Sequence, residues 1–191
     1  MTTFDALFTA FTFAAHVMLL NSQTFDMQLQ EVPDITKFYT TNSNIWIVNT
    51  TMPTIDFCKL DFVNMTTAQY TNFSRLYFRG TTMERDDLEG MFTYIDKNRT
   101  NCTIYDAMTV HPRNGTTVNR SIETLLYQFE EYSCGIFAVL LLPEQKGPYF
   151  DIRVKQTTIT SPNASCIRLY QNLTAERTVT TTYNHSCQDT R

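Results

Sequence analysis

Eight short runs rich in β-branched and aromatic residues recur along the middle of the chain, and turn-forming residues separate them. The separating segments include Met52-Pro53, Arg79-Gly80 and Asn114-Gly115, which are typical of links between antiparallel strands. The spacing therefore predicts a meander of hairpins. The predicted strands are Ile45 to Thr51, Phe57 to Asn64, Tyr70 to Arg79, Leu88 to Asp96, Cys102 to Val110, Ile122 to Glu130, Cys134 to Leu142 and Tyr149 to Lys155.

Eight antiparallel strands can close into an up-and-down barrel that is just wide enough for one small ligand. After the eighth run, Ser161-Pro162-Asn163 is a helix start signal, so we expect a short C-terminal helix before the Thr-rich tail. The predicted fold class is mostly β: an eight-stranded antiparallel barrel of the lipocalin type with a short C-terminal helix and a disulfide-tied tail. A two-sheet sandwich uses the same alternating strands, and periodicity does not exclude it.

The N-terminus carries an apolar stretch, Leu7 to Leu20, that is too short to span a bilayer comfortably and is followed by a polar run. This outline predicts a signal peptide over residues 1–22 and a single domain over residues 23–191. No basic residue precedes the stretch and His16 interrupts it, so a buried N-terminal helix is the alternative.

Ten Asn-x-Ser/Thr sequons support a secreted glycoprotein. They lie at Asn49, Asn64, Asn72, Asn98, Asn101, Asn114, Asn119, Asn163, Asn172 and Asn184. With 13 Asn and 40 Ser plus Thr residues in the chain, chance alone gives about three. Each occupied sequon must lie on the surface.

The five cysteines show no C-x-x-C spacing, so disulfides in an oxidising compartment are expected rather than a zinc or redox site. One cysteine must remain outside intrachain pairs, and spacing leaves the connectivity open.

Outside the predicted signal only His111 and His185 remain, and neither lies in a nucleophile motif. No phosphate-binding loop or metal-ligand spacing occurs, so we expect a protein that is not an enzyme and has no cofactor or metal. The net charge of -4 argues against a nucleic-acid partner.

The segment from Glu131 to Cys187 contains EYSCGIFAVLLLPEQKGPYFDIRV, SPNASCIRLYQNL and YNHSC, and it resembles the C-terminal half of tick salivary lipocalins. With the strand that contains Trp46, the resemblance covers about Ile45 to Cys187. It implies a protein secreted into saliva that scavenges histamine, serotonin or leukotrienes, or that modulates host immune cells.

The resemblance also implies a disulfide pattern. The family's bonds map onto Cys58 with Cys187 and onto Cys134 with Cys166. Cys102 is then unpaired or bonded to another chain.

The ligand class is inferred from two strand segments. Amine-binding members resemble one another in a Cys-Asp pair followed on the next strand by Glu-Leu-Trp, where this chain has Cys134-Gly135 and Asp151-Ile152-Arg153. Strand alternation places Phe150 inside and Asp151 on the solvent side. We therefore expect a sterol or lipid mediator, as in the Japanin-like immunomodulatory branch that acts on dendritic cells. An amine scavenger and a filled barrel that binds a host protein are the alternatives.

Alternation along the strands also selects the candidate ligand-binding residues. They are Trp46, Phe92, Tyr94, Tyr127, Phe129, Phe137 and Phe150 for an apolar interior, with Glu123 and Asp106 as inward carboxylates.

The sequon at Asn72 conflicts with strand alternation, because Asn72 lies on the same face of its predicted strand as Leu76 and Phe78. A glycan on Asn72 would put those apolar groups outside, so we expect either a bulge or an unoccupied sequon.

Overall fold

A computed structural model describes residues 32–95, 104–113 and 119–190. The predicted signal peptide, Cys102 and the sequons at Asn98, Asn101 and Asn114 lie outside the described residues. No helix of the described part is long and apolar enough to cross a membrane.

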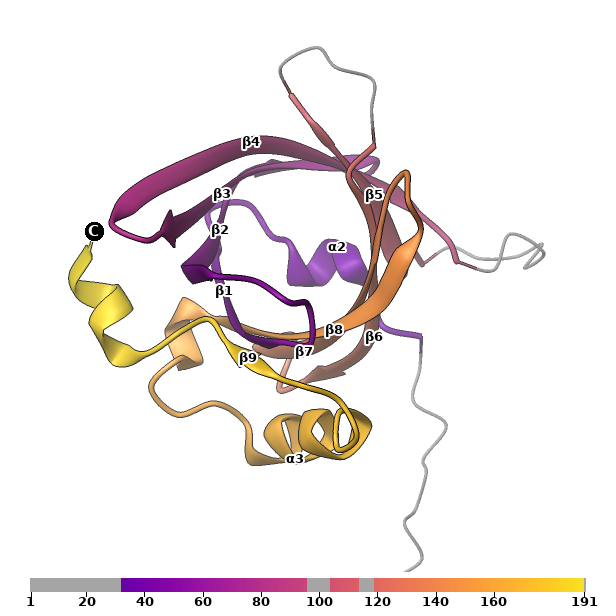
Figure 1. Cartoon of the computed structure of the whole chain (residues 1–191). Coiled ribbons are helices and arrows are strands. Elements are labelled where there is room, and N and C mark those ends of the chain that lie inside the picture. Colours follow the sequence, from indigo (N-terminus) through magenta and orange to yellow (C-terminus); the bar gives the residue numbers. More distant parts are fainter. Residues whose placement is uncertain (1–31, 96–103, 114–118, 191) are drawn as a thin grey trace, which may run out of the picture. The chain divides into compact units, whose positions relative to one another are not determined.

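Eight antiparallel strands form a closed barrel, as the sequence predicts (Figure 1). Neighbouring strands pair in chain order, and β1 pairs with both β8 and β2, which closes the sheet and excludes the sandwich alternative. The strands are β1 (Asn44–Thr50), β2 (Asp56–Thr66), β3 (Tyr70–Arg79), β4 (Thr82–Thr93), β5 (Ala107–Pro112), β6 (Ser121–Phe129), β7 (Cys134–Leu141) and β8 (Lys146–Lys155).

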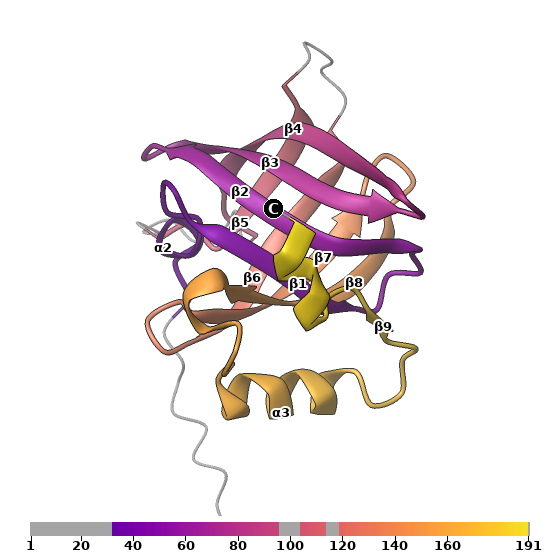
Figure 2. The same cartoon turned by 90° about the vertical axis from the view of Figure 1, so that its left-hand side faces the viewer.

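One end of the barrel is closed by the short helix α2 (Ile35–Phe38), which lies opposite the loop that joins β1 to β2 (Figure 2). Asp34 caps the helix by accepting a hydrogen bond from the Thr36 N–H at 3.0 Å. Ile35 and Phe38 are fully buried, so the apolar side of α2 forms part of the barrel core. The opposite end of the barrel remains open.

The C-terminal segment lies outside the barrel (Figures 1 and 2). It contains the 3-10 turn η1 (Gln156–Thr158), helix α3 (Ala164–Leu173), the two-residue strand β9 (Thr180–Thr181) on β1, and the 3-10 helix η2 (His185–Thr190). Asn163 caps α3 by accepting a hydrogen bond from the Cys166 N–H at 2.9 Å. The predicted short helix is confirmed.

Two disulfides attach this segment to the barrel, and both agree with the predicted pairs. Cys134–Cys166 joins β7 to α3, and Cys58–Cys187 joins β2 to η2. The paired cysteines are 129 and 32 residues apart in sequence. The two bonds fix the C-terminal segment at two separate points of the barrel wall, one on β2 and one on β7.

The apolar residues form two clusters rather than one. The interior cluster, around α2, consists of Ile35, Phe38, Tyr39, Ile45, Val63, Phe73, Leu88, Phe92, Met108, Val110, Leu125 and Phe137. The outer cluster, between the barrel wall and the C-terminal segment, consists of Trp46, Cys58, Leu60, Cys134, Ile136, Ile152, Val154, Ile159, Cys166, Tyr170, Tyr183 and Cys187. Strands β1, β7 and β8 are therefore apolar on the outside as well.

This second cluster corrects the predicted direction of several side chains. Trp46 packs on Tyr183 of the tail, with 4.9 Å between ring centroids, and Phe150 packs beneath Arg177. Tyr127 and Phe129 pack against the outer cluster because a bulge in β6 follows Leu125 and reverses the face of the strand. These four aromatic residues were predicted to line the interior, but they lie outside it.

Strand β8 shows the same reversal. Ile152 and Val154 pack in the outer cluster, whereas Asp151 and Arg153 face the interior and are buried. The expectation that Asp151 is solvated is wrong, because the C-terminal segment covers the face of β8 that strand parity alone assigns to the interior.

Candidate ligand-binding cavity

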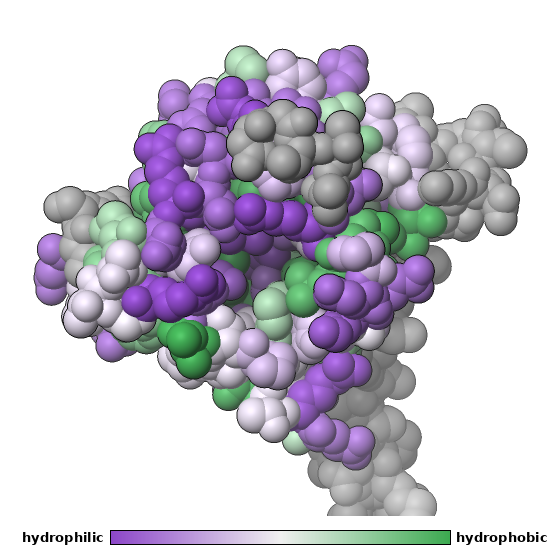
Figure 3. All heavy atoms as spheres, turned by 45° about the horizontal axis from the view of Figure 1, so that its top comes forward, coloured by the Kyte–Doolittle hydropathy of each residue, from purple (hydrophilic) through white to green (hydrophobic). Residues whose placement is uncertain are grey.

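A cavity of about 290 Å³ occupies the barrel interior on the side away from α2. Figure 3 shows a hollow on the open side of the molecule with both hydrophilic and hydrophobic residues around it. The cavity is lined by Ile47, Met52, Asp56, Lys59, Arg75, Tyr77, Arg79, Asp86, Leu88, Val110, Arg120, Ser121, Glu123, Val139, Leu141, Asp151 and Arg153. Nine of these seventeen side chains are charged, which is unusual for a barrel interior.

Arg153 lies at the floor of this cavity and is fully buried. Its guanidinium donates hydrogen bonds to the Tyr39 hydroxyl at 2.6 Å, to Glu123 Oε2 at 2.5 Å and to Asp151 Oδ2 at 2.7 Å. The ring of Phe137 lies 4.3 Å beneath the guanidinium carbon. Arg153 thus separates the charged cavity from the interior apolar cluster.

Arg75 extends the same network across the barrel. It donates to both carboxylate oxygens of Asp61, at 2.7 and 2.8 Å, and to Glu123 Oε1 at 3.1 Å. Tyr39 closes the ring by donating its hydroxyl hydrogen to Asp61 Oδ2 at 2.8 Å. Strands β2, β3, β6 and β8 and the end of α2 are therefore joined by one network of charge-assisted hydrogen bonds.

The network holds Glu123 and Arg153 in their charged forms. Burial alone would raise the pKa of Glu123, but the guanidinium groups of Arg153 and Arg75 outweigh burial and hold that pKa well below its usual range. Burial likewise opposes the charge on Arg153, yet Glu123, Tyr39 and Asp151 raise its pKa above the ordinary value. Burial raises the pKa of Tyr39 as well, so its hydroxyl keeps its proton as a donor to Asp61.

Two ion pairs form the rim. Arg79 Nη2 lies 3.0 Å from Asp56 Oδ1, and Arg120 Nη1 lies 2.8 Å from Asp86 Oδ2. Both arginines are about half exposed, so each pair contributes little to stability. Their role in the cavity is to set the polarity of its mouth.

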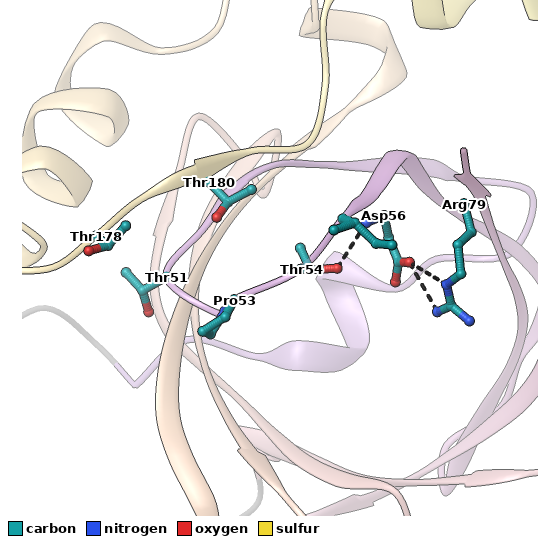
Figure 4. A pocket seen from close by; sticks show the side chains of 8 residues that line it. Thr51, Pro53, Thr54, Asp56, Arg79, Thr178 and Thr180 are labelled. Atoms are coloured by element: carbon teal, nitrogen blue, oxygen red, sulfur yellow. Dashed lines mark hydrogen bonds and ion pairs between the residues drawn. The ribbon is translucent and has the colours of Figure 1, made fainter. Parts of the chain in front are cut away.

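A second, wider depression of about 680 Å³ lies outside this rim, between the β1–β2 loop and the tail (Figure 4). It is formed mainly by threonines with Pro53 and Ile55, and Ile55 is 79% exposed. Asp56 and Arg79 line both spaces and form the boundary between them. Because a ligand would remain largely solvated in this depression, the cavity inside the barrel is the better candidate site.

The structure places the nine predicted ligand-binding residues in four groups. Only Glu123 lines the cavity; Phe92 and Phe137 are inside the barrel but belong to the interior apolar cluster. Tyr94 stacks on Tyr105 at 4.7 Å, and Asp106 accepts a hydrogen bond from the Ile95 N–H at 2.9 Å, so neither lines the cavity. The remaining four, Trp46, Tyr127, Phe129 and Phe150, are the outward residues described above.

Sequence reasoning missed Lys59, Arg75, Asp151 and Arg153. The predicted C-terminal helix and tail cysteine were a signal that could have revealed them. A helix and a disulfide-tied tail must pack against some outer face of the barrel. Strands under that cover must carry apolar residues outside, which assigns the charged alternate positions of β8 to the interior.

No known family profile and no curated protein matches the chain, whereas solved structures do. AM182 in complex with serotonin is 15% identical with a TM-score of 0.58, covering 82% of this chain and 93% of that chain. Japanin from Rhipicephalus appendiculatus, bound to cholesterol, is 8% identical with a TM-score of 0.53, covering 80% and 99%. An LTBP1 complex with LTC4 is 10% identical with a TM-score of 0.53, covering 80% and 88%. The chain therefore has a lipocalin-like fold.

Proposed function

We propose that this chain is a carrier that binds one small polar ligand in the charged cavity of the barrel. The observation that carries the proposal is the composition of the cavity wall, where five cationic and four anionic side chains surround a space of about 290 Å³. A volume near the lower end of the ligand-pocket range suits a small molecule.

The polar walls favour a different ligand class from the apolar one that the sequence predicts. A sterol has a single hydroxyl group, so it would remove water from Lys59, Asp151 and the rim pairs without replacing the lost hydrogen bonds. Burying charged groups in this way costs several kcal/mol, about 2–7 for each unpaired polar group. A charged or strongly polar ligand avoids this cost.

The similar structures bind chemically different ligands, namely serotonin, cholesterol and LTC4. The fold is therefore compatible with each class, and the wall of the individual cavity must decide between them. Of the two carrier functions weighed from the sequence, the wall favours the scavenger of small charged mediators over the sterol carrier.

Secretion and glycosylation are part of the proposal. Two disulfides between distant segments suit an oxidising compartment, and the sequon residues Asn64, Asn119, Asn172 and Asn184 are exposed. Action in tick saliva on host inflammation, including dendritic cells or another host immune-cell target, stays a prediction from the sequence resemblance.

The test is native mass spectrometry of the secreted, deglycosylated protein, with organic extraction, followed by titration with histamine, serotonin, cholesterol and leukotriene C4. We expect a 1:1 complex with at least one charged small molecule and none with cholesterol. Cholesterol that co-purifies at 1:1 would contradict the proposed ligand class. A protein that binds no small molecule would favour the filled scaffold that engages a host protein.

A matched pair of variants assigns the binding to the cavity. Leu141 lines the cavity, whereas Leu140 precedes it on β7 and points to the opposite face. Leu141→Trp should abolish binding by filling the space, and Leu140→Trp should leave it within about twofold of the wild type. Equal binding by both variants would place the ligand elsewhere.

A further inference from the structure

Two charged side chains in the cavity each have a polar atom without a partner among the described residues. Asp151 is 4% exposed, and its Oδ1 accepts no hydrogen bond, although Oδ2 is bound by Arg153. Lys59 lines the same cavity without an ion pair to any described residue. The other four cations of the wall are all paired with carboxylates, namely Arg75, Arg79, Arg120 and Arg153.

The two groups lie on opposite sides of β1. Asp151 is on β8, opposite Thr50, and Lys59 is on β2 next to Leu60, whose partner on β1 is Trp46. Strands that flank a third strand are about 10 Å apart, and the two residues lie at different levels along β1, so their backbones are separated by at least this distance. The ammonium of Lys59 is within reach of the field of Asp151, which raises the pKa of Lys59, although burial and Arg75 lower it overall.

Part of the remaining cavity wall is aliphatic. Leu88 of β4, Val110 of β5, and Val139 and Leu141 of β7 present aliphatic side chains to the same space. The side chain of Asp151, whose Oδ1 accepts no hydrogen bond, the side chain of Lys59 and four aliphatic side chains therefore line one volume of about 290 Å³. A matching ligand needs a cationic group, an anionic group and an apolar side chain.

We propose that the cavity selects a small zwitterion of amino-acid size, whose ammonium group donates to Asp151 Oδ1 and whose carboxylate accepts from the Lys59 ammonium. This inference rests on the proposed carrier function and adds the ligand's chemistry. A ligand with only one of the two charges leaves either Asp151 Oδ1 or the Lys59 ammonium group without a partner, which weakens its binding.

The test compares three ligands that share one ring system and differ in charge. The full chain is titrated calorimetrically with L-tryptophan, with tryptamine, which lacks the carboxylate, and with indole-3-propionate, which lacks the ammonium group. We expect L-tryptophan to bind at least tenfold more tightly than either analogue. Tryptamine that binds as tightly as tryptophan, or no binding by any of the three, would overturn the inference.

Two cavity variants should then respond in a crossed pattern. Asp151→Asn should weaken the binding of L-tryptophan and of tryptamine at least tenfold and leave the affinity for indole-3-propionate unchanged. Lys59→Met should weaken the binding of L-tryptophan and of indole-3-propionate and leave the affinity for tryptamine unchanged. The controls are Lys37→Met, at the closed end of the barrel and 63% exposed, and Asp189→Asn, exposed in η2. They should change no affinity.

The outcomes separate this inference from the carrier function. If histamine or serotonin binds at 1:1 and Leu141→Trp abolishes that binding, the carrier function holds even when tryptophan has no advantage. If Lys59→Met weakens the binding of all three indole ligands equally, Lys59 shapes the cavity and does not bind the ligand's carboxylate. Thermal unfolding of each variant checks that the barrel remains folded.

Discussion

Arg153 is a fully buried cation in the interior network. It contacts Tyr39, Glu123 and Asp151 at once. Replacing both members of a buried ion pair by apolar residues can be neutral, but removing one member leaves its partner charged and uncompensated. The cost of losing Arg153 should therefore far exceed that of losing any exposed arginine.

We expect Arg153→Met to lower the free energy of unfolding by about 3–5 kcal/mol, because Glu123 loses a close counter-ion in the interior. Urea denaturation at neutral pH measures the change. Arg168→Met is the control, since Arg168 is exposed on α3 and should change stability by no more than about 0.5 kcal/mol. A similar small effect of Arg153→Met would show that the network does not stabilise the fold.

Asn72 provides a second test at the scale of one residue. It lies on the same face of β3 as Leu76 and Phe78, and these two residues pack outside against the outer cluster, so no bulge is needed. Asn72 itself is only 8% exposed. We expect glycopeptide mapping to find Asn72 unoccupied and Asn172, which is exposed on α3, occupied. Full occupancy at Asn72 would contradict this packing.

At the scale of elements, the strands were largely predictable and their faces were not. Local alternation and turn chemistry place β3 at Tyr70–Arg79, as predicted, and end β7 and β8 within one residue of the prediction. The face of a strand depends on what covers it, and the cover of β8 comes from residues far along the chain. The bulge after Leu125 also reversed the face of β6, and alternation cannot locate such a bulge.

The short helix α2 and the bulge in β2 escaped prediction for related reasons. Four residues give too little periodicity to identify a helix, and α2 is stabilised by burial of Ile35 and Phe38 in the barrel. At the β2 bulge, Cys58 has a φ of 54°, which sequence does not indicate for a cysteine. Lys59 therefore could not be assigned to the interior from sequence.

The two disulfides allow a prediction about the C-terminal segment. Replacing Cys58 and Cys187 by Ser should lower the free energy of unfolding by about 1 kcal/mol more than replacing Cys134 and Cys166, because the longer loop releases more chain entropy. Chemical denaturation of both double variants measures the difference. A larger loss from the shorter loop would indicate that α3, through its packing, contributes more than the closure of the chain.

At the scale of the whole molecule, the interior network should make the free energy of unfolding fall at acidic pH. The folded pKa of Glu123 lies well below its ordinary value of 4.5, so below about pH 4.5 the unfolded chain binds a proton that the folded protein does not. The stabilisation from Glu123 is complete above that pH and is lost as the pH falls towards the folded pKa.

We expect the free energy of unfolding of the wild type to fall more steeply below about pH 4.5 than that of Glu123→Gln, which cannot titrate at this position. At neutral pH the variant should be the less stable protein, and the difference should shrink with acidification. Urea denaturation across this range measures both curves. Parallel curves would show that Glu123 does not carry the acid sensitivity.

The attachment of the tail to β2 has a consequence for how the protein is made. The Cys58 N–H donates to the Thr182 carbonyl at 2.7 Å, and the Cys58–Cys187 disulfide holds the same bulge, immediately before Lys59. During synthesis, all eight strands are therefore present before the tail can hold the bulge next to Lys59. We expect Lys59 to reach its final position only after Cys187 has been synthesised and oxidised, so a ligand that needs Lys59 should bind the oxidised chain and not the nascent one.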